Sequence, residues 1–346
     1  MLRLQHTGCM KKFWVNDGKV VCGMREYKPV SKSRRNLRVF LLFIISVFFV
    51  GIAASIAVIG CNYVENQQFR ETFYCVSSLK VNNRIRVVQI SDLHNCVYGN
   101  NNSEIIDRVT KLNPDLILYT GDCVDAKTGS FDRIVSLCAA LADVAPSYYI
   151  YGNNEVEKSY DAPLTQIYLD GKFGFNDSNR DPQALLNIPD SFTDKLESVG
   201  VKVLKNSMDT ITVGETKIDV YGVLTSNPSS FWSYAGESFN DYLYTNEANL
   251  KITAIHEPLI FEEYAPDFWG DLMLAGHTHG GTVRVPLFGP LYTREGGLFP
   301  QRSGAYVYGR TDVQGRPLIV SGGLENTNIF RINNQPEIVV VDINKF

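Results

Sequence analysis

An uncharged apolar run from Val39 to Ile59 constrains this chain more than any other feature, because its side chains must be withdrawn from water. A helix of about 20 apolar residues is long enough to cross the hydrocarbon core of a bilayer. A buried core helix is the alternative, but such a helix is rarely apolar on every face over this length. We therefore expect a transmembrane anchor over residues 39–60 and a separate folded domain after it.

Residues 1–38, which precede the run, carry far more Lys and Arg than Asp and Glu. Basic flanks of a membrane helix stay in the cytoplasm, so we expect a single-pass protein of the cell membrane with its main domain outside. This basic cytoplasmic leader is long for a cleaved signal peptide, which favours an uncleaved signal anchor. The alternative is cleavage or lipidation at Cys61, because Val58–Cys61 resembles a lipoprotein cleavage box. Residues 61–80 are expected to form a stalk or an entry strand.

Residues 81–346 alternate between apolar strand patterns and amphipathic helix patterns, which is typical of a layered α/β domain. Two irregular stretches, residues 155–190 and 227–249, interrupt this alternation. Irregular stretches of that length are usually functional or disordered, so we treat both as excursions from one domain. The clearest expected strands are 84–91, 116–119, 148–151, 252–255 and 272–274.

Each of these five strands is followed within three residues by Asp, Asn or His. Ligand sites in α/β sheets lie beyond the carboxyl ends of the strands, so these side chains are expected to meet. Four of the five histidines in the chain belong to this set. Any one of the motifs is common in surface turns, but together they predict one site, whose candidate residues are Asp92, His94, Asp122, Asp125, Asn153, Asn154, His256, His277 and His279.

The chemistry of these side chains points to metal ions. In an extended segment residues two apart face the same way, so His277 and His279 should point into one space. Imidazole, carboxylate and amide oxygens suit Mn, Fe or Zn, and thiolates are missing from the set. Two neighbouring cations need an anionic bridge, for which Asp122 is the natural candidate. Such a pair attracts a phosphoryl group and can lower the pKa of bound water from ~16 to about 7.

The full set of motifs resembles the calcineurin-like metallophosphoesterase superfamily. The resemblance rests on Asp92-x-His94, Gly121-Asp122-x-x-Asp125, Gly152-Asn153, His256 and Gly276-His277-x-His279. The later stretch GGTVRVPLFGPLY, residues 280–292, resembles the membrane-anchored bacterial phosphodiesterase branch.

This resemblance implies a four-layer α-β-β-α sandwich, the metallo-dependent phosphatase fold. It implies that one metal is held by Asp92, His94, Asp122 and His279. The other would be held by Asp122, Asn153, His256 and His277, while Asp125 would orient a ligand.

The chain departs from the family pattern at Asn154, where Gly-Asn-His-Glu normally has its histidine. An amide can donate a hydrogen bond to a phosphoryl oxygen but cannot give a proton to the leaving group. Loss of such help costs about 10²–10⁴ in rate. The enzyme would then prefer a phosphoanhydride or an aryl ester, or else turn over poorly. Glu155 and Tyr160 are candidate replacement acids.

We therefore expect a metallophosphoesterase that hydrolyses phosphodiesters or phosphoanhydrides with a hydroxide held by two metal ions. The alternative is a catalytically weak, metal-binding receptor or scaffold that displays the two excursions. A nuclease is disfavoured, because the net charge of −4 is unlike the basic balance of nucleic-acid-binding proteins. The expected partners are the membrane and a phosphate ester or pyrophosphate, with lipid-linked phosphates, wall polymers and nucleotides all left open.

Overall fold

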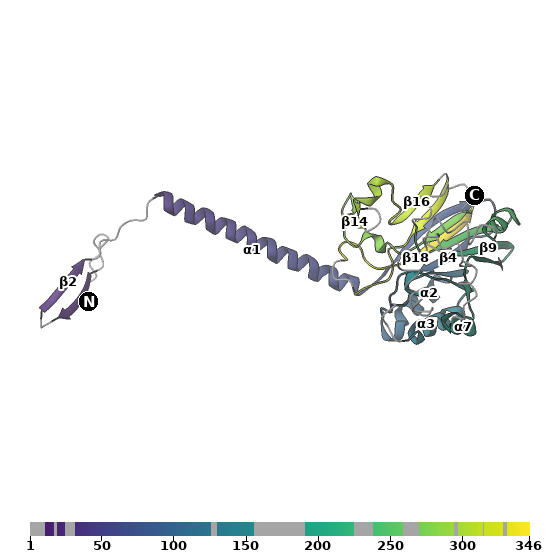
Figure 1. Cartoon of the computed structure of the whole chain (residues 1–346), viewed down its shortest axis with the longest axis horizontal. Coiled ribbons are helices and arrows are strands. Elements are labelled where there is room, and N and C mark those ends of the chain that lie inside the picture. The colour runs from purple at the N-terminus through teal and green to yellow at the C-terminus, as the bar shows by residue number, and fades with distance from the viewer. Residues whose placement is uncertain are drawn as a thin grey trace, which may run out of the picture. The chain divides into compact units, whose positions relative to one another are not determined.

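The computed structural model describes residues 11–16, 19–24, 32–125, 130–155, 191–224, 238–258, 270–293, 297–313, 315–327 and 331–346. The chain divides into two compact units, Met1–Val58 and Ile59–Phe346. The first unit contains an antiparallel hairpin of β1 (Lys11–Asn16) and β2 (Lys19–Met24), and the larger part of helix α1 (Lys32–Asn66). The second unit contains the end of α1 and all the other described elements, some of which are labelled in Figure 1.

Helix α1 is longer than the expected span of residues 39–60, because helical structure continues to Asn66. Its large apolar side chains are exposed, among them Phe40 and Phe48, so the helix buries no apolar face inside the protein. By length and composition, Arg35–Asn66 is the one candidate membrane span in the described part of the chain. The structure thus has one N-terminal apolar helix that could serve as a membrane anchor or as a signal sequence.

Residues 61–80, expected to form a stalk or an entry strand, contain the end of α1 and a strand of the folded domain. Strand β3 (Arg70–Ser78) pairs in parallel with the last strand, β18 (Glu337–Lys345). At the end of α1 the Asn62 and Asn66 side chains are buried. The sequence could not reveal which elements receive the segment, because that strand and those loops lie more than 200 residues later.

Two six-stranded sheets make up the second unit. The order in the first is β3-β18-β4-β5-β6-β7, where the new strands are β4 (Ile85–Ile90), β5 (Leu116–Thr120), β6 (Ser147–Ile150) and β7 (Val201–Leu204). The order in the second is β16-β17-β11-β10-β9-β8, formed by β8 (Ser207–Val213), β9 (Thr216–Val223), β10 (Leu250–Ile255), β11 (Leu272–Ala275), β16 (Gly309–Val313) and β17 (Arg316–Val320).

The central strands of each sheet are parallel: β4 to β7 in the first, and β9, β10, β11 and β17 in the second. Parallel strands end at the same edge of a sheet. The loops that follow the central strands of each sheet therefore gather at one edge.

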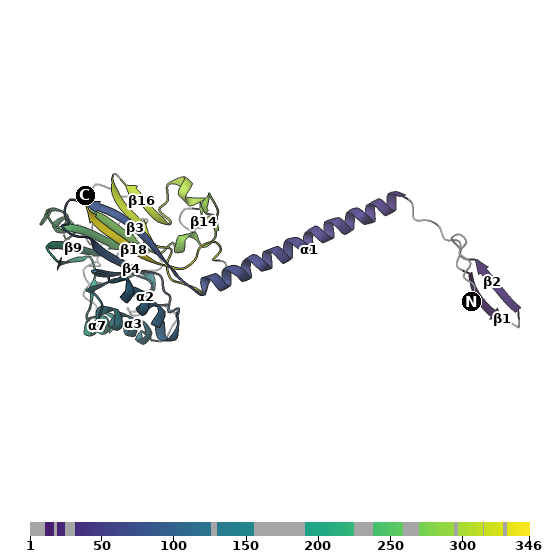
Figure 2. The same cartoon turned by 180° about the vertical axis from the view of Figure 1, so that it is seen from behind.

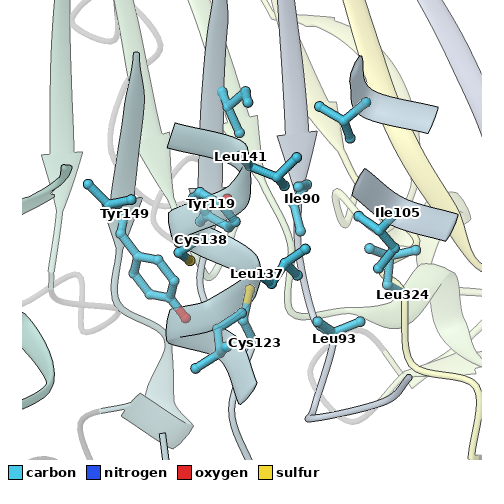
Figure 3. Packing of buried hydrophobic residues seen from close by; sticks show 14 of the residues in the cluster. Ile90, Leu93, Ile105, Tyr119, Cys123, Leu137, Cys138, Leu141, Tyr149 and Leu324 are labelled. Carbon is cyan, nitrogen blue, oxygen red and sulfur yellow. The ribbon is translucent and has the colours of Figure 1, made fainter. Parts of the chain in front are cut away.

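Alternation along the strands builds the layers. On β4, Val87 packs between the two sheets, whereas its neighbour Val88 faces the helices. Helices α2 (Ser103–Leu112), α3 (Asp132–Ala142) and α7 (Ser191–Ser198) cover the first sheet on one side (Figures 1 and 2). Figure 3 shows three of the α3 side chains against that sheet: Leu137, Cys138 and Leu141.

The outer face of the second sheet is also covered by helical residues. Met273 on β11 packs outward with Phe239 and Tyr242, which belong to helical residues 238–244. The order of layers is therefore helix, sheet, sheet, helix, and the expected four-layer sandwich is confirmed. The rest of the expected excursions, residues 156–190 and 227–237, lies outside the described residues.

Two short antiparallel ladders follow β11. They pair β12 (Arg284–Val285) with β13 (Gly289–Pro290), and β14 (Tyr292–Thr293) with β15 (Gly297–Leu298). We call residues 283–299, which contain these four strands, the β12–β15 tip.

Ile252 tests the packing between the sheets, because its side chain is fully buried there. Replacement by Ala should lower the free energy of unfolding by about 2–5 kcal/mol, since it removes apolar contacts and leaves a cavity. Urea denaturation of the full-length chain in detergent measures the change. Thr212→Ala, at an exposed position on β8, should change it by less than ~0.5 kcal/mol. Equal effects of the two changes would contradict the two-sheet core.

Candidate metal centre

The polar residues that follow the strands come from both sheets. Asp92 and His94 follow β4, Asp122 follows β5 and Asn153 follows β6, all in the first sheet. The second sheet contributes His256 after β10, and His277 and His279 after β11.

Six of these side chains form two groups. In each group one donor atom per residue lies within 4.8 Å of the others, and the groups are Asp92–His94–His279 and Asp122–His256–His277. Each group combines residues from both sheets. The structure thus brings together six of the seven residues that the sequence analysis named as metal ligands, while their role as ligands stays a prediction.

Two carboxylates lie between the groups. Asp122 Oδ2 is 3.3 Å from His256 Nε2 and 3.9 Å from His94 Nε2, so it approaches one histidine of each group. Asp92 Oδ1 is 3.5 Å from His279 Nε2 and 4.0 Å from His256 Nε2. Both aspartates are buried, and buried carboxylates need positive charge nearby.

The electrostatics of the site favour a cation. Burial alone would lower the pKa of His256, but Asp122 and Asp92 outweigh burial and raise that pKa to about 10. In turn, His256 and His94 hold the pKa of Asp122 well below its usual range, against the effect of burial. The two carboxylates therefore attract positive charge to the place where the histidines converge.

The ring nitrogens face each other in pairs. His94 Nε2 is 3.2 Å from His279 Nε2, and His277 Nδ1 is 3.2 Å from His256 Nε2. One proton can lie between two such nitrogens, whereas a cation can accept lone pairs from both. In a neutral His256, Nδ1–H would donate to the Thr120 carbonyl, 2.8 Å away, and would leave the Nε2 lone pair toward Asp122.

Asn153, the seventh residue predicted as a ligand, has a distinct signature. Its Oδ1 atom is buried and accepts no hydrogen bond from the described residues. A buried oxygen without a partner costs about 1–3 kcal/mol, so it needs a reason to be there. An amide oxygen together with carboxylates and imidazoles would make a donor set that fits Mn, Fe or Zn.

The backbone around the site is strained. Five of the seven candidate ligands have a positive φ: Asp92 (51°), His94 (45°), Asp122 (51°), His277 (70°) and His279 (48°). Left-handed residues other than glycine are uncommon and cluster at functional sites. These residues lie just after their strands in a strained conformation. Contacts with neighbouring groups must stabilise that conformation.

Glu155 is one such group. Its buried carboxylate accepts hydrogen bonds from the backbone N–H groups of Asp122 (2.7 Å), Cys123 (2.8 Å) and Gly152 (2.8 Å), and from the Tyr149 hydroxyl (2.7 Å). It therefore joins the loop after β5 to the loop after β6. That Glu155 replaces the missing acid stays a hypothesis; its oxygens are buried and accept these hydrogen bonds, and burial raises its pKa to about 7.

Two glycines allow the close approach of these loops. A Cβ atom added to Gly276 would lie 2.0 Å from Ser91 Oγ and 2.6 Å from Asp92 Oδ2. One added to Gly152 would lie 2.3 Å from Asp122 Oδ1. Any side chain at either position would displace an aspartate of the site.

Asn154 lies against Asp122. Its backbone N–H donates to Asp122 Oδ1 (2.8 Å) and its side-chain amide to Asp122 Oδ2 (2.6 Å). Asp125, three residues after Asp122, is half-buried, and its expected role in orienting a ligand stays a prediction. Tyr160, the other suggested acid, lies outside the described residues.

The sequence analysis missed Glu325. Its Oε2 atom is 3.0 Å from His279 Nδ1, on the opposite side of the ring from Asp92. Burial would raise the pKa of Glu325, but His279 outweighs burial and lowers that pKa to about 2. Metal-bound histidines commonly donate their second N–H to such a carboxylate. Glu325 lies five residues beyond the end of β17, so the rule that identified Asp, Asn and His directly after a strand does not find it.

The chain is similar to proteins of known family. The model of the family described as calcineurin-like phosphoesterase matches residues 85–281. The sequence is 27% identical over 234 residues to "Phosphodiesterase YaeI" of Escherichia coli (strain K12), covering 66% of this chain and 70% of that protein. It is 25% identical over 260 residues to "Uncharacterized metallophosphoesterase YkuE" of Bacillus subtilis (strain 168), covering 74% and 77%.

Among solved structures, phosphopantetheinyl hydrolase (PptH) from Mycobacterium tuberculosis is similar to 71% of this chain and 92% of its own. The sequence identity is 13% and the TM-score is 0.39, so this likeness carries no further argument.

Glu325→Gln tests how His279 is held. We expect metal affinity to fall about 10–100-fold, because the glutamine cannot stabilise the charge on the His279 ring as a carboxylate does. Equilibrium dialysis of the full-length protein against Mn²⁺ measures this affinity. The control is Glu257→Gln, since Glu257 Oε1 is 4.0 Å from His277 Nε2, beyond hydrogen-bonding distance, and affinity should change little. Unchanged affinity in Glu325→Gln would rule out the orienting role.

Proposed function

Because the chain belongs to the calcineurin-like phosphoesterase family, we propose that it is a hydrolase of phosphodiesters or phosphoanhydrides that uses two divalent cations, Mn, Fe or Zn. The observation that carries this proposal is the double group of donors around Asp122 and Asp92. Six side chains from two sheets lie within reach of common centres, and the unpaired oxygen of Asn153 lies in the same set of loops. No structural role within the described residues accounts for that arrangement.

We assign the donors as follows. Asp92, His94, Asp122 and His279 would hold one cation, and Asp122, Asn153, His256 and His277 the other. Bound cations would polarise the phosphoryl oxygens and supply a water-derived nucleophile near neutral pH. The chain's own part is to hold the carboxylates and rings in place, through Glu155, Glu325 and the Thr120 carbonyl.

Asn154 shapes the choice of substrate. Its side-chain amide is next to Asp122, so it can donate a hydrogen bond to a phosphoryl oxygen held beside that carboxylate. It has no proton to give to a departing alkoxide. The enzyme should therefore favour substrates whose leaving group is stable as an anion, such as an aryl ester or a phosphoanhydride.

We also propose that α1 is an uncleaved membrane anchor, with the basic leader in the cytoplasm and the hydrolase domain outside. The exposed apolar surface of α1 supports this, since an apolar helix that is not buried in protein needs lipid around it. The substrate would then be an extracytoplasmic phosphoester, on a lipid or a wall polymer.

A metal-binding receptor or scaffold remains the second candidate, and Asn154 is the observation in its favour. In the structure the amide and N–H of Asn154 occupy both oxygens of Asp122. A receptor would bind Mn²⁺ normally and hydrolyse none of the phosphoester classes. Comparing metal binding with turnover in one preparation separates the two functions.

Asp122→Asn tests the proposed bridge. Replacement removes the charge shared by the two groups, so metal-dependent hydrolysis of bis(p-nitrophenyl) phosphate should fall by at least ~10², more than the loss of an outer partner of a metal ligand causes. The assay uses the full-length chain in detergent with added Mn²⁺ or Zn²⁺. Asp107→Asn, on the exposed face of α2, should retain wild-type activity. Activity that survives in Asp122→Asn would remove the proposed centre from the reaction.

Asn154→His tests the missing acid. The imidazole should raise kcat for an alkyl phosphodiester by about 10²–10⁴, because it can protonate the leaving oxygen. The rate for an aryl ester, which needs no such proton, should change little. Asn154→Ala is the control, as it also frees Asp122 but adds no acid. Wild-type protein that cleaves alkyl and aryl esters equally fast would contradict the assigned role of Asn154.

A further inference from the structure

The end of helix α1 is held by a loop close to the metal centre. The Asn66 side chain donates to the Arg331 carbonyl (2.7 Å), and Asn62 Oδ1 accepts from the backbone N–H of Asn333 (2.8 Å). In the same loop the Asn334 side chain donates to the carbonyl of His279 (2.6 Å). Residues 331–334 therefore connect the end of the helix to a candidate metal ligand.

The same loop also supports the β12–β15 tip. The backbone N–H of Arg284 donates to the Ile332 carbonyl (3.0 Å), and that of Ile332 donates to the Thr282 carbonyl (3.1 Å). The Asn333 side chain adds a bond to the Arg284 carbonyl (3.2 Å). Residues 331–334 thus form hydrogen bonds to the end of α1, to His279 of the metal centre and to the base of the tip.

The tip presents apolar side chains to solvent. Leu287 is fully exposed, and the exposed fractions of Leu298, Tyr292 and Phe288 are 67%, 58% and 52%. The described residues of the tip beyond Arg284, 285–293 and 297–299, contain no charged side chain, and in the sequence Arg294 and Glu295 lie between them. An exposed apolar group of this kind marks an interaction surface, and leucine beside aromatic rings is typical of a protein surface that enters the head-group region of a bilayer.

The short spacing along the chain between the apolar run of α1 and Asn62 indicates how far the 331–334 loop can lie from a bilayer crossed by α1. The apolar run of α1 ends at Ile59, three residues before Asn62, and one helical turn advances about 5.4 Å. A bilayer crossed by α1 would therefore end within about a turn of the 331–334 loop. The tip, rooted on that loop, has the membrane as its neighbour.

We propose that the β12–β15 tip docks into the surface of the bilayer that α1 crosses, and that the metal centre acts on a phosphoester carried by an amphiphile of that membrane. The inference rests on the proposed anchor and hydrolase. Docking fixes the domain at a second point besides α1, so the strand ends that carry the metal ligands stay next to the lipid head groups. A phosphoester in that layer reaches the centre without leaving the membrane.

Contact with lipid is measured without any hydrolysis. Full-length Leu287→Trp is reconstituted into phosphatidylethanolamine–phosphatidylglycerol vesicles that contain acyl-brominated lipid. The control is Leu79→Trp, which replaces a side chain that is 81% exposed just after β3. The nine residues of β3 extend over roughly 30 Å, so Leu79 lies far along the strand from the end of α1. Fluorescence should be quenched about twofold more in Leu287→Trp. Equal quenching overturns the proposal. So does blue-shifted but unquenched emission from the Leu287→Trp variant, which would assign the tip to a second copy or another segment.

Substrate delivery is measured by comparing two substrates. The double variant Leu287→Asp, Leu298→Asp changes only exposed side chains, and Asp tolerates the positive φ (68°) at position 287. We expect kcat/KM to fall about tenfold for a p-nitrophenyl phosphodiester of a dialkylglycerol in vesicles, because docking is weakened. The value for soluble bis(p-nitrophenyl) phosphate should stay at the wild-type level.

The matched control is Leu79→Asp, Phe346→Asp, where Phe346 is 86% exposed and adjoins the end of β3. It should behave as wild type on both substrates. An equal effect of the tip variant on both substrates, or no effect on either, overturns delivery from the membrane. Wild-type protein that cleaves neither substrate would instead refute the hydrolase, and the quenching experiment would still decide whether the tip docks.

Discussion

Two buried carboxylates, Asp92 and Asp122, set the conditions for the rest of this structure. An ionised carboxylate without a partner costs several kcal/mol when it is withdrawn from water. Here two of them lie at the junction of two sheets, surrounded by four histidine rings. The arrangement is stable only with positive charge between the groups, either as protons on the rings or as cations. That requirement explains why the pKa of His256 is raised while that of Asp122 is lowered.

The loops that carry these groups hold a strained backbone, and the strain is opposed by a few buried contacts. Glu155 gathers the N–H groups of two loops, and Gly152 and Gly276 leave the space that the aspartates occupy. On the other side, the buried guanidinium of Arg331 donates to the carbonyls of Gly323 (3.1 Å) and Glu325 (3.2 Å), and so shapes the loop that holds His279. Local distortion at the strand ends is thus supported by polar contacts rather than by apolar packing.

The same contacts join the site to the rest of the chain. The Arg331 carbonyl accepts from Asn66 at the end of α1, while its side chain supports the Glu325 loop. Residues 331–334 therefore contact the end of α1, the β12–β15 tip and a residue of the candidate metal centre.

The sequence alone determined the features that depend on local order. Strand patterns ended in Asp, Asn or His, and parallel strands bring such ends to one edge, so the candidate site and the layered fold could be predicted before any coordinates. The apolar run of α1 was equally plain, because it needs only length and composition. Only the tertiary structure decided which distant segments and side chains contact the candidate site and the end of α1. The burial of Asn62 and Asn66, the entry of residues 70–78 into the first sheet, and the contact of Glu325 with His279 all join segments far apart in the chain, and no local periodicity encodes them.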